Sequence, residues 1–481
     1  MSQPSTSGST FDVVVIGAGP AGENAADYAV KNGLTAAIVE SELVGGECSY
    51  WGCMPSKALL RPTEVLAAAR RVPAAAAAIT GEVDVQKVLA NRDAFTSNLD
   101  DQGQVDWLEG AGVTLVRGHG RIAGERRVEV TGADGAVTTL TATRGVVIGV
   151  GTKASEPPIP GLAETVTWGN REVVSIKQVP ERLLVLGGGV IGVEMAQAIA
   201  RLGAREVTIV EALDGLLGNE DPHIGEELRA ALEADGIRVE VGATAEKVRR
   251  DGTDGPVTLT LADGRELVGD ELLVAVGRTA LTADLGLASI GVEPARGGFV
   301  DVDDHLRVPG HDWLYVVGDA NGRALLTHQG KYQARLVGDA LAGIEVDPAW
   351  ADERAVPRVV YTDPQVAAVG ATEAEAREAG VDVLAVTYNV GHSAGGALLG
   401  KGTDGTAKLV IDRERRVIVG ASFVGPGVGE MLHAATIAIV GEVALETLWH
   451  AVPPFPSVSE VWLRLLEEAR AAERRDAGDR R

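Results

Sequence analysis

Residues 12–40 read DVVVIGAGPAGENAADYAVKNGLTAAIVE, and this stretch decides the fold. Its parts are, in order, an apolar run at 12–16, glycines Gly17, Gly19 and Gly22, a helical stretch at 23–31, and a second apolar run at 35–39 ending at Glu40. Short apolar runs of this kind are typical of buried parallel strands. The glycines let backbone amides approach a pyrophosphate at the helix N-terminus, and the acid binds ribose hydroxyls. The pattern therefore predicts a dinucleotide-binding unit.

The same pattern occurs a second time. Its parts are a strand at 182–186, glycines Gly187, Gly189 and Gly192, a helix at 193–202, and a strand at 207–210 followed by Glu211. One chain therefore carries two dinucleotide sites. No other internal repeat is present, and the different insertions in the two copies indicate different ligands.

The acid of the second copy predicts a preference for NADH over NADPH. The carboxylate of Glu211 would accept hydrogen bonds from an adenosine ribose but would repel a 2'-phosphate. The three residues that follow, 212–214, include no arginine to receive such a phosphate.

The only two cysteines of the 481 residues, Cys48 and Cys53, lie within the sequence GGECSYWGCMPSK, 45–57. A structural disulfide closing so short a loop would remove little entropy from the unfolded chain. A zinc site would need two further ligands that no nearby histidine or cysteine supplies, so no metal site is predicted. A thiolate beside Lys57, at the start of a predicted helix, would have its pKa lowered by the positive charge of the lysine and by the helix N-terminus. We therefore interpret the pair as redox-active, with two buried unreactive thiols as the alternative.

Composition sets the class of protein. A chain of 481 residues with 45% hydrophobic residues and a mean hydropathy of +0.09 is typical of a globular protein of about three domains. The net charge of -24 argues against nucleic acid or an anionic membrane as a partner. No run of 18 apolar residues and no signal core occurs, so neither a membrane span nor export is predicted and the cytoplasm is the expected compartment.

These motifs resemble those of the flavoprotein disulfide reductases, or pyridine nucleotide-disulfide oxidoreductases, the family of dihydrolipoamide dehydrogenase, glutathione reductase and mercuric reductase. Three further segments carry the likeness: Val147–Gly151, Ala275–Arg278 and Leu314–Asp319. The resemblance covers about residues 10 to 468. It implies an α/β fold with two doubly wound, Rossmann-like domains and a C-terminal α+β dimerisation domain, an FAD-dependent NAD(P)H oxidoreductase, and a homodimer acting on a small-molecule acceptor.

The resemblance also implies a role for each matching residue. FAD would be held by Gly17, Gly19, Gly22, Glu40, Gly46 and Asp319, and NADH by Gly187, Gly189, Gly192, Glu211 and Gly277. Cys53 would be the thiol nearer the flavin ring, and Cys48 the interchange thiol that meets the substrate. Lys57 would pair with Glu194 near the flavin N5.

The resemblance also implies domain boundaries. The expected order is a disordered tail at 1–10, an FAD-binding domain at 11–155, an NAD(P)-binding domain at 156–280, a return segment of the FAD domain at 281–347, a dimerisation domain at 348–470, and a tail at 471–481. The first of these domains is expected to contain an alanine-rich helical insert at 62–78.

The main departure from the family pattern is Phe455. Dihydrolipoamide dehydrogenases and glutathione reductases carry a histidine here that exchanges protons with the interchange thiol, and a glutamate, matched by Glu460, that orients its ring. Phenylalanine cannot take a proton, and loss of a positioned acid/base typically slows a reaction by about 10²–10⁴. Mercuric reductases also carry Phe-Pro here but add a cysteine pair that this chain lacks. His450 could replace the missing base, although capping or packing of a helix end is the favoured interpretation.

A second departure is the aromatic pair Tyr50 and Trp51 between the two cysteines, which could narrow the substrate side or simply pack. Our first interpretation is that electrons pass from NADH through FAD to a non-standard disulfide, a quinone-like molecule or a metal ion. The first alternative is a dihydrolipoamide dehydrogenase that lacks the usual base. The second is a flavin redox sensor without turnover, against which the intact Cys48, Cys53 and Lys57 argue.

Overall fold

The computed structural model describes residues 9–479, with side chains described up to Arg475. The chain forms two compact units, each assembled from three segments. The first comprises the residues up to Pro55, Arg92–Ser155 and Gly277–Asp352; the second comprises Ser56–Asn91, Glu156–Val276 and the residues from Glu353 onward. Residues 1–8 of the predicted N-terminal tail, and residues 480–481 of the predicted C-terminal one, lie outside the described residues.

A seven-stranded sheet forms the centre of the first unit. The strand order is β3-β2-β1-β6-β5-β4, and β16 pairs with β6. The strands are β1 (Ser9–Ile16), β2 (Ala36–Glu40), β3 (Thr114–Arg117), β4 (His119–Ile122), β5 (Arg127–Thr131), β6 (Val137–Ile148) and β16 (Leu314–Val316). β3, β2, β1, β6 and β16 run parallel, whereas β4 and β5 are an antiparallel extension. The predicted return segment thus contributes a strand, β16, to the first sheet.

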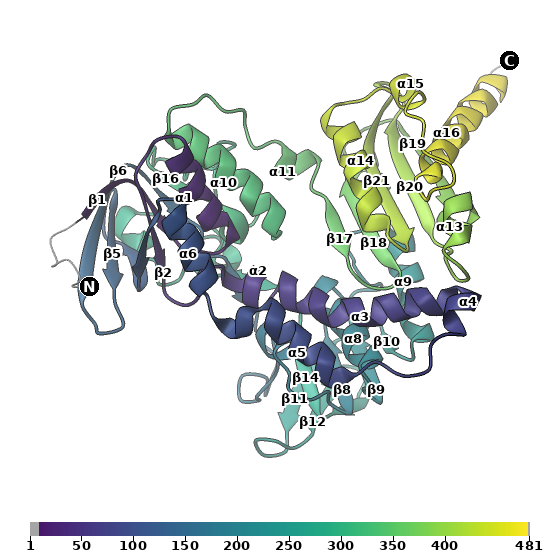
Figure 1. Ribbon diagram of the computed structural model, residues 1–481, viewed down its shortest axis with the longest axis horizontal. Coiled ribbons are helices and arrows are strands. Elements are labelled where there is room, and N and C mark those ends of the chain that lie inside the picture. The colour runs from purple at the N-terminus through teal and green to yellow at the C-terminus, as the bar shows by residue number, and fades with distance from the viewer. Residues whose placement is uncertain (1–8, 480–481) are drawn as a thin grey trace. The chain divides into compact units, whose positions relative to one another are not determined.

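Two helices, α1 (Pro20–Lys31) and α10 (Thr327–Leu341), cover one face of this sheet (Figure 1). Their alanines, valines and leucines form one apolar cluster with the residues of β1 that point toward them, among them Val13 and Val15. The smaller elements of the unit are α2 (Gly46–Tyr50), η1 (Ser97–Leu99), α6 (Gln102–Gly110), β7 (Thr152–Ala154), β15 (Arg278–Ala280), η2 (Leu287–Ile290), η3 (Arg296–Gly298) and η4 (Gly318–Asn321). Three helices include residues of both units: α3 (Cys53–Arg71), α5 (Val85–Phe95) and α11 (Ala351–Arg354).

The second glycine pattern builds an analogous sheet in the second unit. Four parallel strands lie in the order β10-β9-β8-β14. The elements are α4 (Pro73–Ala76), α7 (Asn170–Val174), β8 (Arg182–Leu186), α8 (Val190–Arg201), β9 (Glu206–Val210), α9 (Pro222–Ala234), β10 (Arg238–Glu240), β11 (Ala245–Arg250), β12 (Val257–Leu261), β13 (Glu266–Gly269) and β14 (Glu271–Val274). Antiparallel β11, β12 and β13 form a separate sheet. It packs on the four-stranded sheet of the same unit through apolar residues such as Leu184 and Leu259.

The C-terminal part of the second unit is an antiparallel sheet of order β17-β18-β21-β20-β19. Its elements are β17 (Arg358–Val360), β18 (Gln365–Gly370), α12 (Glu373–Glu378), β19 (Val383–Asn389), η5 (Val390–His392), α13 (Ala394–Leu398), β20 (Thr406–Asp412), β21 (Val417–Gly425), α14 (Val428–Val440), α15 (Leu445–Leu448) and α16 (Glu460–Asp479). α14 packs on the sheet (Figure 1) through Leu432 and Ala435. Ile437, on another face of this helix, is 56% exposed.

The predicted fold class, α/β with two doubly wound units and a C-terminal α+β part, is confirmed. The prediction of a separate helical insert at 62–78 is wrong. The helix here, α3, begins at Cys53, continues through Pro62 and ends at Arg71, and the short α4 follows it. Helix α1 begins at Pro20 rather than residue 23, because proline is well suited to the first helical position. Among residues 9–479 no helix is both long and apolar enough to cross a membrane.

Gly22→Ala tests the contact that seats α1 on β1. A methyl group at this position would lie 1.9 Å from the carbonyl oxygen of Gly17, so the helix must shift away from the strand. We expect the free energy of unfolding, measured by urea denaturation, to fall by about 1–3 kcal/mol.

Gly103→Ala on the same unit is the matched control. An added Cβ there meets no described atom within 4 Å outside its own helix turn. Gly103→Ala should leave the free energy of unfolding unchanged or raise it by up to about 1 kcal/mol, because alanine is the better helix former. Equal stability of the two variants would contradict the contact.

Candidate active site

The first glycine turn is a cradle that only small residues permit. Gly17 has a φ of +98°, and Gly22 lies against the carbonyl oxygen of Gly17. Gly19 is the N-cap residue of α1. A Cβ added at Gly19 would have no other atom of the described residues within 4 Å, so the space beside it is open. Backbone amides at a helix N-terminus facing open space fit a pyrophosphate, so the residues present suit a bound dinucleotide such as FAD.

Glu40 holds this turn from the end of β2. Its carboxylate accepts hydrogen bonds from the amides of Ala18, at 2.7 Å, and Glu42, at 2.7 Å. Burial raises the pKa of Glu40 above its ordinary value. Gly46 approaches the same turn, since a Cβ there would lie 2.9 Å from the Cα of Gly19.

Asp319 also lies near this turn. The preceding residue, Gly318, is close enough that an added Cβ would meet the methyl of Ala21 at 3.0 Å. The Asp319 carboxylate accepts a hydrogen bond from Thr152 at 2.7 Å, and burial raises its pKa. The structure therefore brings together all six residues predicted to hold the flavin.

The two cysteines lie in consecutive helices: Cys48 is the middle residue of the short α2, and Cys53 is the first residue of α3. Both are in the thiol form and partly buried. The sulfur of Cys53 lies 3.4 Å from the hydroxyl of Thr327, on α10. A hydrogen bond with the Cys53 thiol, followed by burial, raises the pKa of Cys48. The lowered pKa that the sequence predicts is that of a thiol beside Lys57 at a helix start, which is the position of Cys53, so the raised pKa of Cys48 does not test it.

The predicted ion pair between Lys57 and Glu194 is present, with Nζ and Oε2 at 2.8 Å. The Glu194 side chain is only 3% exposed, and its other oxygen accepts the amide of Tyr361 at 2.9 Å. The ammonium group of Lys57 also lies 4.9 Å from the centre of the Tyr361 ring. Sequence reasoning missed Tyr361 because no motif links it to the two residues it contacts.

The second glycine turn repeats the geometry of the first. Gly187 has a φ of +111°, and a Cβ at Gly192 would lie 2.0 Å from the Gly187 carbonyl oxygen. Gly189 again caps its helix beside open space. The carboxylate of Glu211 accepts the amides of Gly188, at 2.6 Å, and of Leu213. Four of the five residues predicted to hold NADH therefore converge.

The fifth residue, Gly277, belongs to the first unit. It has a φ of +137°, and its carbonyl oxygen accepts the amide of Ser155 at 3.0 Å.

The C-terminal residues make the following contacts within their own chain. Phe455 is 77% exposed. Glu460 is buried, and its carboxylate accepts from Arg464 at 2.6 Å and from the amide of Ala394 at 3.2 Å. His450 is exposed at the end of α15, where its amide caps the helix. Position 455 therefore offers no proton acceptor, and the acid nearby is used to join α16 to α13.

The position of Tyr50 favours packing, rather than a substrate contact, as the role of this residue of the aromatic pair. Its ring is buried, and its hydroxyl donates to the carbonyl of Val44 at 3.0 Å and contacts Gln104. The ring of Trp51 meets that of Tyr50 edge-on, with centroids 5.7 Å apart, and is only partly buried.

Glu23 is a second residue that sequence reasoning missed. It follows the last glycine of the first turn, and its Oε1 is buried with no hydrogen-bond partner among the described residues. Burial raises the pKa of Glu23 to about 7, against the attraction of Lys331. No group of three or more His, Cys, Asp or Glu side chains suited to a metal ion occurs in the described part of the chain.

Comparison with known proteins identifies relatives over nearly the whole chain. The family described as Pyridine nucleotide-disulphide oxidoreductase matches residues 11–334, and its dimerisation domain matches residues 356–466. The dihydrolipoyl dehydrogenase of Thermus scotoductus is 35% identical over 472 residues, covering 96% of this chain and 97% of that protein. The mercuric reductase of Lysinibacillus sphaericus is 31% identical over 453 residues, covering 94% and 81%.

Solved structures agree. The HOCl-induced flavoprotein disulfide reductase RclA from Escherichia coli aligns with a TM-score of 0.83 at 25% identity, covering 95% of this chain and 99% of that one. LpdA from Mycobacterium tuberculosis aligns with a TM-score of 0.84 at 25% identity and the same coverage.

The buried carboxyl of Glu23 predicts a pH dependence of stability. Its pKa rises from an ordinary value of 4.5 to about 7 in the folded protein, so between these pH values the folded state binds more protons than the unfolded state. Stability must therefore fall as pH rises through this window. Glu23→Gln should remove that loss, gaining up to about 3 kcal/mol near pH 8 and almost nothing near pH 4.5.

Urea denaturation of the wild type and of Glu23→Gln across this pH range measures the difference in their free energies of unfolding. Glu109→Gln, at an exposed position of α6, is the control and should leave the pH profile unchanged. Parallel profiles for wild type and Glu23→Gln would show that Glu23 does not titrate in this window.

Proposed function

Because this chain belongs to the pyridine nucleotide-disulphide oxidoreductase family, we propose that it takes electrons from NADH and delivers them to an acceptor other than an ordinary lipoamide or glutathione disulfide. Family membership makes it an FAD-dependent enzyme that uses NAD(P)H. FAD, when bound, accepts a hydride and passes on an electron pair. The acceptor class we propose is a non-standard disulfide, a quinone-like molecule or a metal ion as substrate.

The observation that carries this proposal is the loss of proton transfer around position 455. Phe455 has no proton to exchange, and Glu460 already binds Arg464 and the amide of Ala394. Oxidation of a dithiol to a disulfide releases two electrons and two protons, and a thiol attacks a disulfide only as its thiolate. The raised pKa of Cys48 keeps that thiol protonated near neutral pH, so exchange with ordinary disulfides should be slow.

Each residue then has a proposed role. Gly17, Gly19, Gly22, Glu40, Gly46 and Asp319 hold FAD, and Gly187, Gly189, Gly192, Glu211 and Gly277 hold NADH. Cys53 is the thiol beside the flavin, and Cys48 meets a disulfide substrate. Glu194 fixes the ammonium group of Lys57, and the backbone amide of Tyr361 fixes Glu194 in turn. Glu460 positions the segment that carries Phe455.

We assign residues 11–155 and 281–347 to FAD binding, 156–280 to NADH binding and 348–470 to dimerisation. The dimerisation domain of the family is present in this chain. We propose a two-fold homodimer in which Phe455 faces Cys48 of the partner subunit, which would explain why so large a ring is exposed in one chain. The cytoplasm, where cysteine pairs are kept reduced and cycle, is the compartment we propose.

A second candidate function is dihydrolipoamide dehydrogenase activity without the usual base. The 35% identity to the Thermus scotoductus enzyme over nearly the whole chain favours it. The two candidates differ in one measurable quantity, the rate with lipoamide relative to the rate with a quinone.

Phe455→His tests the proposal. Wild type should reduce lipoamide slowly near neutral pH and faster as pH approaches the thiol pKa, when hydroxide can remove the proton. An imidazole five residues before Glu460 should raise the lipoamide rate at least about tenfold, since a positioned acid/base contributes about 10²–10⁴. The rate of NADH oxidation with a quinone should stay almost unchanged.

Phe455→Leu, which keeps the site apolar, is the control and should leave both rates as in wild type. Arg464→Gln combined with Phe455→His releases Glu460 from its ion pair and should raise the lipoamide rate further. A wild-type enzyme as fast on lipoamide as on any quinone would reject the proposal in favour of the second candidate.

The nucleotide preference gives an independent test. Glu211 should make NADH better than NADPH by about tenfold or more in kcat/KM, a difference of about 1.4 kcal/mol in transition-state binding. Glu211→Gln removes the charge but keeps an acceptor oxygen for only one of the two amides, that of Gly188 or that of Leu213, so the preference should shrink. Equal use of both nucleotides by the wild type in steady-state kinetics would contradict the assignment.

A further inference from the structure

The ring of Tyr361 contacts the ammonium group of Lys57, with 4.9 Å between Nζ and the centre of the ring. The same ammonium group lies 2.8 Å from one carboxylate oxygen of Glu194. The other oxygen of that carboxylate accepts the amide of Tyr361 at 2.9 Å. Tyr361 therefore contacts both members of the ion pair, Glu194 through its backbone and Lys57 through its ring.

The segment that carries this ring, residues 361–363 after β17, is bound along α8. Beyond the bond to Glu194, the amide of Asp363 donates to the side chain of Gln197 at 2.8 Å. Gln197 donates back to the carbonyl oxygen of Asp363 at 2.9 Å. Glu194 and Gln197 are three positions apart on α8 and so share one face of the helix. The backbone on both sides of residue 362 is thus fixed to that face.

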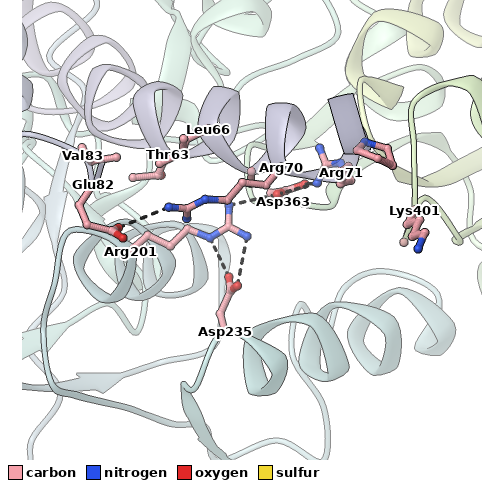
Figure 2. A pocket seen from close by; sticks show the side chains of 13 residues that line it. Thr63, Leu66, Arg70, Arg71, Glu82, Val83, Arg201, Asp235, Asp363 and Lys401 are labelled. Atoms are coloured by element: carbon pink, nitrogen blue, oxygen red, sulfur yellow. Dashed lines mark hydrogen bonds and ion pairs between the residues drawn. The ribbon is translucent and has the colours of Figure 1, made fainter. Parts of the chain in front are cut away.

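The side chain of Asp363 attaches the segment at a further point. Its carboxylate accepts two hydrogen bonds of 2.9 Å from Arg71, at the end of α3, and one of 3.1 Å from Arg201, on α8 (Figure 2). Because Lys57 and Arg71 both belong to α3, the segment contacts that helix twice. It therefore has little freedom to carry the ring away from Lys57.

A ring and a carboxylate hold a cation in different ways. A carboxylate cancels the charge that it attracts, whereas the face of an aromatic ring attracts a cation and adds no net negative charge. A second acid beside Lys57 would also repel the carboxylate of Glu194, which is only 3% exposed. The Lys57 side chain is 34% exposed, so water competes with Glu194 for the ammonium group. Tyr361 therefore supplies a second anchor that preserves the positive charge.

We propose that the ring of Tyr361 positions the ammonium group of Lys57 and thereby raises the reduction potential of the flavin. The inference rests on the role proposed above for Lys57 beside the flavin. A fixed cation near the flavin favours its electron-rich reduced form, so a less well fixed cation should make the flavin harder to reduce. Tyr361 is a positioning residue in this scheme, because it acts through Lys57.

The midpoint potential of the flavin, measured by dye-coupled reductive titration of the FAD-loaded protein, tests the proposal. Every protein compared carries Cys48→Ser and Cys53→Ser, so that the flavin is the only redox group. Tyr361→Leu keeps the backbone bonds but removes the ring, and because Tyr361 is 42% exposed the fold should be unaffected. The flavin should become harder to reduce by at least about threefold, a fall of about 14 mV. Tyr361→Phe keeps the ring and should have the parent's potential.

Lys57→Gln determines whether Tyr361 acts through the lysine. This variant removes the positive charge but keeps a donor for Glu194, and it should lower the potential by itself. Addition of Tyr361→Leu should then produce no further fall. Tyr28→Leu is the matched control, since it removes a ring that lies 5.1 Å from the ammonium group of Lys31 on α1. Its potential should equal that of the parent.

A potential of Tyr361→Leu equal to the parent's, or an undiminished fall on the Lys57→Gln background, would overturn the proposal. An equal fall in Tyr361→Phe would assign the effect to the hydroxyl group and so reject the role of the ring. The titration needs no substrate acceptor. A failure here is therefore distinct from a failure of the proposed acceptor class, which the lipoamide and quinone rates report.

Discussion

The contact between a glycine Cα and the carbonyl oxygen at the end of the preceding strand is the constraint on which both nucleotide folds depend. At Gly22 and at Gly192 a methyl group would lie within 2.0 Å of that oxygen. The contact draws the helix N-terminus onto the strand, and beside the N-cap residues Gly19 and Gly189 the space is open. Everything proposed for the pyrophosphates rests on that space being open.

Each acid after the second strand supports this arrangement before any ligand binds. Glu40 accepts the amide of Ala18, and Glu211 accepts the amide of Gly188. A residue usually described as a ribose ligand is therefore also part of the turn. Since one carboxylate has two oxygens, each with more than one lone pair, it can hold the turn and still accept from a ribose hydroxyl.

Much of this could be predicted from local sequence, because glycine turns, strand lengths and the Lys57 motif are encoded within about thirty residues. Residues that depend on packing between distant segments could not. Tyr361 contacts Glu194 across 167 positions, and Thr327 contacts Cys53 across 274. The burial of the Glu23 carboxyl could not be predicted either, because nothing in the neighbouring sequence indicates it. The raised pKa of Cys48 likewise comes from a partner thiol and burial that only the folded chain supplies.

That raised pKa has a consequence for the lifetime of the enzyme. Peroxides and alkylating agents attack thiolates, and an irreversibly oxidised cysteine can no longer cycle. A thiol whose proton is held by its neighbour and by burial reacts slowly with such agents while the enzyme waits in its reduced form. The same feature that we propose slows Cys48 toward ordinary disulfides would also protect it from these agents.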